Sequence, residues 1–281
     1  MTIDIVSFNR MARISVIMGI YNCASTLVEA LDSLYAQTYQ DFKIILCEDG
    51  STDNTYEVAE EYVAHHNNII LLRNAKNLKL AATLNRCLEY VDTEYVARMD
   101  GDDVSLPTRF EKEIQFLDEH PEYALVSCPM IYYDENGDWM IGTEKEKPQK
   151  RDFYFGHIFC HAPMMMRTSI LREVDGYTDE PWTIRCEDYY LWYKVYKAGY
   201  IGYNIQEPLY KMRDNRDAFK RRTIKSRWNY YKVSVKVKKS LGLKYPYLSG
   251  TFDLAKILLP DSFLRFCRRL LGSLLLKRNS N

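Results

Sequence analysis

The chain has 281 residues, of which 47% are hydrophobic and 27% charged, so a folded core is expected and a disordered chain is excluded. Its 12 glycines and 9 prolines are too few for a fibrous or low-complexity protein. The net charge is zero, but residues 1–210 hold 19 basic and 34 acidic side chains, whereas residues 211–281 hold 19 basic and 4 acidic ones. This asymmetry predicts an acidic body with a basic tail that attracts an anionic partner, either nucleic acid or an anionic membrane.

The seven cysteines include no CxxC pair, and most lie in apolar segments. An odd number of cysteines without metal-ligand spacing predicts reduced, buried thiols in a cytosolic protein. The first residues lack the charged start, apolar run and small-residue cleavage site of a signal peptide. No apolar stretch reaches the ~18 residues that a membrane-spanning helix needs. We therefore expect a cytoplasmic protein.

The first half of the sequence alternates apolar runs with amphipathic segments. The apolar runs end at turn-forming or acidic residues and predict strands at Ile14–Met18, Ile44–Cys47, Ile69–Leu72 and Tyr95–Met99. Helices are expected after these strands: one capped by Ser25, one capped by Asp53 that runs to about His65, one over Leu80–Val91, and one from Pro107 to about His120. Four successive strand–helix units imply an α/β fold with a mostly parallel sheet and flanking helices.

The second half has a different rhythm. It predicts, in chain order, a strand over Ala124–Tyr133, a hairpin turn at Asn136 and Gly137, an irregular segment over 143–160, a short helix over Met164–Val174, an aromatic-rich helix over Glu187–Ala198, and strands at Ile201–Ile205 and Leu209–Met212. Further on, Phe263–Leu276 predicts an amphipathic helix of 14 residues with arginines opposite its apolar face. At ~1.5 Å per residue this helix is too short to cross a bilayer, so it is expected either at a membrane interface or packed on protein.

Acidic residues gather where the predicted strands end, and parallel sheets bind ligands at the carboxyl ends of their strands. Asp100, Asp102 and Asp103 directly follow the fourth strand. Three carboxylates so close together repel one another unless a cation lies between them, and oxygen ligands of this kind suit Mg²⁺ or Mn²⁺. The simpler alternative is a solvated acidic turn, but the position at a strand end favours a functional site.

Two further acidic positions have both a functional and a structural interpretation. Asp49 follows the second strand, so it can accept a hydrogen bond from a nucleotide base or a ribose, or it can simply form a turn. Glu187 and Asp188 begin the aromatic-rich helix, where acids either interact favourably with the helix dipole or supply a general base. Trp182 and the tyrosines that follow it suit a sugar platform, although they can equally be core residues.

Taken together, these segments resemble the inverting glycosyltransferases of family 2, which have the GT-A fold. The resemblance lies in the order and spacing of Ile14–Asn22 (ISVIMGIYN), Ile45–Thr52 (ILCEDGST), Asn77–Asn85 (NLKLAATLN), Tyr95–Arg109 (YVARMDGDDVSLPTR) and Glu187–Trp192 (EDYYLW). It implies a GT-A catalytic domain over residues 1–215, with a nucleotide-binding part over about 12–120 and an acceptor part over about 121–215. Residues 216–281 are expected to form a basic helical C-terminal extension.

The resemblance implies a role for each matching acid. Asp49 matches the acid that contacts the nucleotide base, and Asp100 matches the acid near the ribose and diphosphate. Asp102 matches the metal-binding acid, for which Mg²⁺ or Mn²⁺ is expected. Asp188 matches the catalytic base, which would deprotonate an acceptor hydroxyl. That oxygen would then attack the anomeric carbon from the face opposite the leaving nucleoside diphosphate.

Other site residues follow from the same resemblance. Donor contacts are expected from Gly19, Tyr21 and Lys79, and acceptor or diphosphate contacts from Asp103, His161, Trp182, Glu187 and Arg213. Two positions depart from the family pattern. Gly19-Ile20 replaces a common Pro-Thr pair, and Lys79 replaces a glycine. These departures leave the donor open, with a UDP-sugar as the expectation from the resemblance.

The predicted function is therefore metal-dependent transfer of a sugar from a nucleotide-sugar to a saccharide or lipid-linked oligosaccharide in bacterial surface-polysaccharide synthesis. An anionic membrane surface is the expected partner of the tail, on the inner face of the membrane, and no nucleic acid is expected. Two alternatives remain: a nucleotidyltransferase that makes activated sugars, and a non-catalytic protein with a nucleic-acid-binding tail. A dinucleotide-dependent dehydrogenase is disfavoured, because Gly-Ile-Tyr-Asn stands where GxGxxG is needed.

Overall fold

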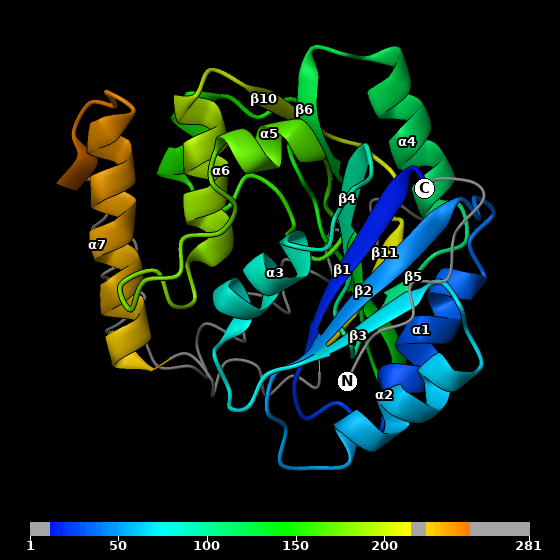
Figure 1. Ribbon diagram of the computed structural model, residues 1–281. Coiled ribbons are helices and arrows are strands. Elements are labelled where there is room, and N and C mark those ends of the chain that lie inside the picture. The colour runs from blue at the N-terminus through cyan, green and yellow to red at the C-terminus, as the bar shows by residue number, and fades with distance from the viewer. Residues whose placement is uncertain (1–11, 215–222, 248–281) are drawn as a thin grey trace.

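The computed structural model describes residues 12–214 and 223–247. The helix expected over Phe263–Leu276 lies outside these residues. Within them, the protein forms a sheet of seven strands with helices on both faces, and a second sheet of four strands beside it (Figure 1). The α/β architecture expected from the sequence is confirmed.

The large sheet has the strand order β10-β6-β9-β4-β1-β2-β3. Its strands are β1 (Ile14–Ile20), β2 (Phe42–Glu48), β3 (Ile69–Arg73), β4 (Tyr95–Arg98), β6 (Tyr123–Ser127), β9 (Met165–Arg167) and β10 (Ile201–Asn204). Neighbouring strands are parallel, except that β9 runs antiparallel to both β4 and β6. The carboxyl ends of β1, β2 and β4 therefore lie at one edge of the sheet, where the predicted donor residues follow them.

Helices cover both faces of this sheet. One face is covered by α1 (Leu27–Tyr35), α2 (Thr55–Ala64) and α4 (Arg109–Glu119), and the other by α3 (Leu80–Leu88), α5 (Thr168–Glu173), α6 (Glu187–Lys197) and the short 3₁₀ helix η1 (Lys150–Tyr154). Helix α7 (Ile224–Ser240) packs on the outer side of α6 and against η1. Successive residues of a strand face opposite sides of the sheet. Val16 and Ile44 therefore pack in the core beneath α1, α2 and α4, whereas Ile17 and Ile45 pack in the core beneath α3, α5 and α6. Because both faces are covered, the central strands are apolar along nearly their whole length.

The small sheet brings distant segments to the acidic loop. Its strands, in the order β5-β11-β7-β8, are β5 (Val104–Ser105), β11 (Tyr210–Arg213), β7 (Met130–Asp134) and β8 (Gly137–Ile141). Strand β5 directly follows the loop that holds the three aspartates and pairs antiparallel with β11, with Val104 opposite Lys211. Because of this pairing, Arg213 contacts Asp103 in the acidic loop, although the two residues are 110 positions apart in the sequence.

Two expected elements were wrong in type or extent. The single strand expected over Ala124–Tyr133 is two strands, β6 and β7, which belong to different sheets. Pro129 lies between them, and a proline has no N–H to donate to a strand ladder. The helix expected over Met164–Val174 begins instead as strand β9, because Met165 and Met166 pair with β4 and β6, and helix α5 starts only at Thr168.

Two expected helix caps also differ. Ser25 does not cap α1: the cap position is held by Thr26, whose hydroxyl donates to the carbonyl oxygens of Cys23 and Gly101. Helix α2 begins at Thr55, so Asp53 lies one residue outside the cap position, yet its Oδ1 still accepts the Thr55 N–H at 3.1 Å. The other strands and helices that the sequence predicts within the described residues differ from the observed ones only at their ends, whereas β5 and η1 were not predicted.

The six cysteines within the described residues are buried and form no disulfide bonds, in agreement with the sequence, and Cys267 lies outside those residues. Among the described helices, none combines the length and the apolar character that crossing a bilayer requires.

Candidate active site

The three aspartates that follow β4 form a compact cluster. Carboxylate oxygens of Asp100, Asp102 and Asp103 all lie within 4.8 Å of one another. Gly101 allows the loop to pass close to the end of β1, because a Cβ atom at this position would lie 2.8 Å from the Sγ of Cys23. The loop is thus packed tightly and presents its three acids together, as expected from the sequence.

Two arginines contact this cluster from different sheets. The buried Arg98, the last residue of β4, forms an ion pair with Asp100. From β11, the backbone N–H of Arg213 donates to Oδ1 of Asp103 at 2.8 Å, and its Nε donates to the carbonyl oxygen of Asp102 at 3.2 Å. The structure therefore brings Arg213 to the acidic loop, where the sequence had placed a diphosphate contact.

The electrostatics of Asp103 favour a cation at the cluster. Burial raises the pKa of Asp103 well above its ordinary value, and the negative charges of Asp100 and Asp102 raise it further. A divalent cation would relieve this repulsion, and carboxylate oxygens are the ligands that hard cations prefer. The three side chains therefore fit a Mg²⁺ or Mn²⁺ site.

Asp49 organises a loop at the ends of β2 and β3. Its Oδ1 accepts hydrogen bonds from the Asn74 amide and the Leu78 N–H, both at 2.8 Å, and its Oδ2 accepts the Lys79 N–H at 3.0 Å. Lys79 has a φ of +76°, a backbone region that favours glycine. The hydrogen bonds to Asp49 thus hold a lysine where the family pattern has glycine.

Gly19 and Tyr21 lie at the end of β1, beside this loop. Gly19 is paired in register with Cys47 of β2, and a Cβ atom on Gly19 would lie 3.1 Å from the Cγ2 of Thr83 on α3. Tyr21 is 45% exposed, so much of its ring faces solvent. The N–H of Asp49 donates to the Ile20 carbonyl at 2.9 Å, which joins the two strand ends. Gly19, Tyr21 and Asp49 therefore lie together at the adjacent ends of β1 and β2.

Asp188 lies in the first turn of α6 and is held by two neighbours. Its Oδ2 lies 3.0 Å from the Nδ1 of His157, and its Oδ1 accepts the N–H of Tyr189 at 2.7 Å. Burial alone would raise the pKa of Asp188, but the charge and hydrogen bond of His157 outweigh burial and hold this pKa well below its ordinary value. Asp188 is therefore ionised near pH 7, with a neighbour at each carboxylate oxygen.

Tyr177 connects Asp188 with the acidic cluster. Its hydroxyl lies 2.8 Å from the Nε2 of His161. Burial raises the pKa of Tyr177, Arg98 opposes this rise, and the charges of Asp188 and Asp100 add to it. Burial, followed by Arg98, also keeps the pKa of His161 well below its ordinary value, so the imidazole is neutral near pH 7. The charges of Asp188 and Asp100 therefore both act on the hydroxyl of Tyr177.

Glu187 and Trp182 have local structural contacts. The Oε1 of Glu187 accepts the N–H of Arg185 at 2.9 Å, and burial raises the pKa of Glu187. The ring of Trp182 packs edge-on against Tyr190 with a centroid distance of 4.9 Å, and the ammonium of Lys236 on α7 lies 3.8 Å from the Trp182 centroid. Trp182 is thus part of the contact between α6 and α7, and its role as a sugar platform stays a prediction.

Sequence reasoning missed three residues of this site: Arg98, Tyr177 and His157. Arg98 offered a usable signal, because a charged residue at the end of an apolar strand is buried only with a partner. His157 lies in a segment without periodicity, and its pairing with Asp188 arises only from tertiary contact. Tyr177 likewise reaches His161 through the fold rather than through a local motif.

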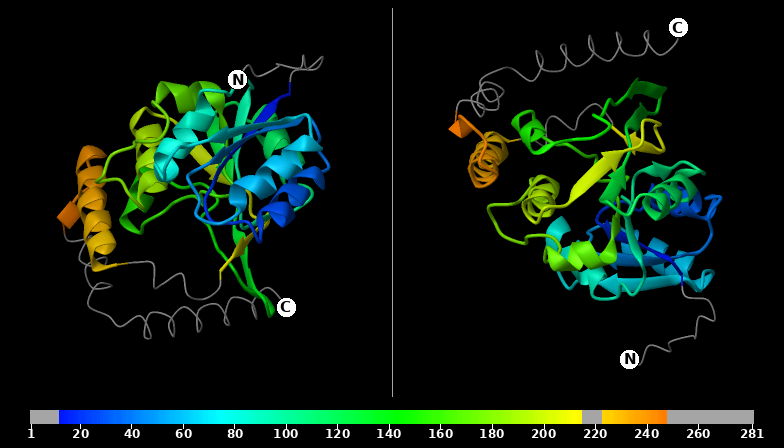
Figure 2. Two further views of the ribbon diagram at one scale, coloured as in Figure 1. Left: turned by 60° about the horizontal axis from the view of Figure 1, so that its bottom comes forward. Right: turned by 90° about the horizontal axis from the view of Figure 1, so that it is seen from above.

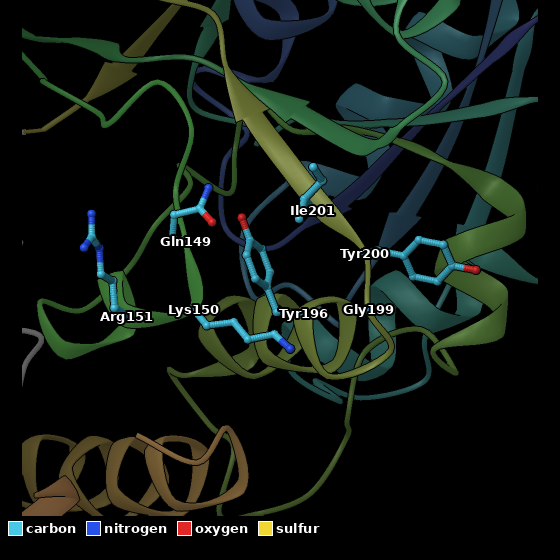
Figure 3. Close-up of a pocket in the computed structure, with 7 residues that line it drawn as sticks. All are labelled: Gln149, Lys150, Arg151, Tyr196, Gly199, Tyr200 and Ile201. Atoms are coloured by element: carbon cyan, nitrogen blue, oxygen red, sulfur yellow. The ribbon is translucent and has the colours of Figure 1, made fainter. Parts of the chain in front are cut away.

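Figure 3 shows a separate hollow of about 490 Å³, which is lined by Gln149, Lys150, Arg151, Tyr196, Gly199, Tyr200 and Ile201. None of the candidate site residues lines it. The candidate active site is therefore the acidic crevice at the strand ends, and not this hollow.

Comparisons with known proteins identify the family of this chain. The family model described as glycosyl transferase family 2 matches residues 15–175. The putative glycosyltransferase EpsE of Bacillus subtilis is 44% identical over 213 residues, which cover 75% of this chain and 77% of EpsE. The Escherichia coli UDP-Glc:alpha-D-GlcNAc-diphosphoundecaprenol beta-1,3-glucosyltransferase WfaP is 27% identical over 193 residues, which cover 67% of this chain and 72% of WfaP.

Solved structures have the same fold. Staphylococcus aureus TarS 1–349 in complex with UDP-GlcNAc gives a TM-score of 0.67 at 20% identity and covers 88% of this chain and 71% of that chain. The mannosyltransferase PcManGT of Pyrobaculum calidifontis, in complex with GDP-Man and Mn²⁺, gives a TM-score of 0.63 at 18% identity and covers 92% of this chain and 80% of that chain. At these identities, the likeness shows the GT-A fold alone. The family match over more than half of the chain, together with the identity to EpsE, shows that this protein is a glycosyltransferase and belongs to glycosyl transferase family 2.

Proposed function

We propose that this glycosyltransferase is metal-dependent and inverting, and that it moves a sugar from a UDP-sugar to a hydroxyl of a saccharide or lipid-linked oligosaccharide in bacterial surface-polysaccharide synthesis. One observation carries the proposal: the carboxylates of Asp100, Asp102 and Asp103 meet within 4.8 Å of one another at the end of β4, while a separate acid, Asp188, is held by His157 and Tyr189 at the start of α6. An inverting transfer needs an acidic cation site and a separate base, and it needs no nucleophile from the enzyme.

Donor binding is assigned to the crevice at the ends of β1 and β2. A carboxylate oxygen has two acceptor positions. The Oδ1 of Asp49 accepts two hydrogen bonds, from Asn74 and Leu78, whereas its Oδ2 accepts one, from Lys79, among the described residues. Oδ2 can therefore accept an N–H of the nucleotide base. The exposed Tyr21 would lie beside the base, and the Lys79 ammonium would approach the diphosphate.

The cation is assigned chiefly to Asp102. Arg98 already compensates the charge of Asp100, so Asp100 is assigned to the ribose and diphosphate of the donor. The buried Asp103, with its raised pKa, is the neighbour that gains most from a nearby positive charge. When bound, Mg²⁺ or Mn²⁺ neutralises the charge that develops on the leaving diphosphate. The Mn²⁺ bound to PcManGT, which shares this fold, supports the assignment.

Asp188 is assigned as the general base. Its carboxylate would accept the proton of the acceptor hydroxyl while that oxygen attacks the anomeric carbon from the face opposite the leaving group. One displacement of this kind inverts the anomeric centre. His157 and Tyr189 each bind one oxygen of Asp188, so the carboxylate has a fixed orientation. His161, Glu187 and Trp182 are assigned to the acceptor side of the crevice.

The acceptor is assigned as a lipid-linked saccharide, and the enzyme as peripheral on the cytoplasmic face of the membrane. WfaP is named for transfer to a diphosphoundecaprenol-linked sugar, which supports this class of acceptor. Residues 211–281, with 19 basic and 4 acidic side chains, supply charge that an anionic surface attracts. Each basic residue near such a surface contributes ~1 kcal/mol. Nucleic acid is not assigned as a partner.

Release of nucleoside diphosphate tests the proposed function. The full chain is incubated with a panel of UDP-sugars and GDP-mannose, with and without Mn²⁺, and with undecaprenyl-diphosphate-linked or short saccharide acceptors. The expected result is release from a UDP-sugar that requires both cation and acceptor, with inversion of the anomeric centre in the product. Release from GDP-mannose alone would correct only the donor, whereas transfer with retention of configuration would refute the mechanism.

A further inference from the structure

Helix α7 reaches both residues that hold Asp188. The ring of Tyr230 on α7 stacks on the ring of His157, with centroids 5.7 Å apart and planes 26° apart. Tyr230 also packs against the ring of Tyr189 at a centroid distance of 5.4 Å. His157 lies 3.0 Å from one oxygen of Asp188, and the N–H of Tyr189 donates to the other at 2.7 Å. One side chain of α7 thus contacts the neighbours of both carboxylate oxygens.

Helix α7 is itself anchored to the catalytic body. Figures 1 and 2 show it along the outer side of α6. Val233 and Val237 belong to the same hydrophobic core as α6. The Asn229 amide donates to the carbonyl oxygens of Trp182 and Ile184 at 2.7 and 3.3 Å, so α7 also holds the loop that leads into Asp188. The position of Tyr230 is therefore fixed relative to the start of α6.

The segment around His157 is shaped to accept Tyr230. Gly156 has a φ of +115°, and a Cβ atom on it would lie 3.2 Å from the hydroxyl oxygen of Tyr230. The His157 side chain is 42% exposed, and its ring contacts those of both Tyr230 and Tyr189, the latter at 5.7 Å and edge-on. Because His157 is at the surface, aromatic contacts rather than deep burial define its rotamer.

We propose that Tyr230 is a positioning residue of the active site, which holds His157 so that its Nδ1 fixes the orientation of the Asp188 carboxylate. The proposal rests on the assignment of Asp188 as the base. It makes α7, which lies in the sequence stretch 216–281, a working part of the catalytic machinery. A misplacement of about 1 Å at a reacting group lowers the rate by up to about 100-fold. Loss of the Tyr230 ring should therefore lower kcat without changing the donor KM.

Paired substitutions in the full chain test the positioning role. Tyr230→Leu removes the ring, and Tyr230→Phe keeps it. Tyr231→Leu is the matched control, because Tyr231 is the next residue of α7 and stacks on Trp228 instead. We expect kcat to fall roughly 10–100-fold in Tyr230→Leu, to be retained in Tyr230→Phe, and to be retained in Tyr231→Leu. Equal kcat values for Tyr230→Leu and Tyr231→Leu would overturn the proposal.

Substitutions of His157 keep the test decisive if Tyr230→Leu fails to fold. His157→Asn places an amide N–H near the position of Nδ1, whereas His157→Ala offers no donor. We expect rescue in His157→Asn relative to His157→Ala, and equal kcat in the two variants would again refute the positioning role. Asp188→Asn tests the assignment of the base separately from the role of Tyr230. Full activity in that variant would refute Asp188 as the base, whatever the effect of Tyr230→Leu.

Discussion

The N–H of Lys79 donates to Oδ2 of Asp49 at 3.0 Å, although Lys79 is held at φ +76° and ψ 162°. These backbone angles are essentially confined to glycine, and they cost another residue on the order of 1–3 kcal/mol. Asp49 also accepts hydrogen bonds from Asn74 and Leu78, so one buried carboxylate holds the whole loop in place. The protein therefore keeps a strained lysine directly before α3, in the loop that Asp49 holds.

Substitution of Lys79 should separate backbone strain from donor binding. Lys79→Gly relieves the strain, so we expect its free energy of unfolding to rise by about 1 kcal/mol, whereas Lys79→Ala keeps the strain and should show no such gain. Both variants lose the ammonium and should raise the donor KM by the same factor. Urea unfolding and donor titration measure the two effects. A donor KM that stays at the wild-type value in both variants would remove Lys79 from the donor site.

Asp102→Asn should abolish cation-dependent transfer and leave the fold intact, because an amide fills the same volume at a loop position. Retained secondary structure by circular dichroism, together with loss of Mn²⁺-stimulated release of nucleoside diphosphate, is the expected result. Asp92→Asn is the control, since Asp92 is exposed and forms an ion pair with Lys43. Full wild-type activity in excess chelator would contradict the metal assignment.

Asp188→Asn should lower turnover by roughly 10²–10⁴, the usual effect of losing a general base. Donor affinity should change little, because the base acts on the acceptor. Glu187→Gln is the neighbouring control and should have a milder effect, since Glu187 binds the N–H of Arg185. Pre-steady-state turnover and calorimetric donor binding give the two quantities. A loss confined to donor affinity would move Asp188 from catalysis to binding.

The positions of the donor acids could be predicted from the sequence because they depend on local signals. An apolar run followed by Asp49, or by Asp100 and its neighbours, marks the end of a buried parallel strand, and such ends converge at one edge of a sheet. The partners of these acids could not be predicted in the same way. His157 meets Asp188 across 31 positions of the chain, and the antiparallel strand β9 is defined by its pairing with the distant strands β4 and β6.

The stability of the protein should fall as pH rises through the range in which Glu113 titrates. Glu113 forms a fully buried ion pair with Arg109, at 3.2 Å, and burial raises the pKa of Glu113 to about 7 although Arg109 opposes the rise. In the unfolded chain this pKa is ~4.3. Between these two pKa values the folded state holds a proton that the unfolded state has lost, so the free energy of unfolding decreases with rising pH.

Glu113→Gln isolates this contribution, because the amide does not titrate. The free energy of unfolding of the wild type minus that of Glu113→Gln should be larger near about pH 5 than near about pH 8. Urea unfolding at the two pH values measures the difference. A difference that is constant or that grows with pH would show that Glu113 is ionised throughout.

The tail from residue 261 onward should bind anionic membranes without being needed for catalysis. The sequence predicts a helix over Phe263–Leu276 with an apolar stripe opposite Arg265, Arg268 and Arg269, a pattern typical of an interfacial helix. Deleting residues 261–281 leaves α7 intact, since α7 ends at Ser240. We therefore expect the shortened enzyme to stay folded, to lose flotation with anionic liposomes, and to keep activity on a soluble acceptor mimic.

The competing explanation for the tail is that its apolar stripe packs on the catalytic body or on a second copy of the chain. It makes the opposite predictions, because removal would then expose apolar surface and cause unfolding or aggregation. Liposome flotation of the full chain at low and high salt adds an independent measurement, since screening weakens attraction between the three arginines and an anionic surface. If the full chain ignores anionic liposomes at low salt, the tail is structural and the membrane assignment is wrong.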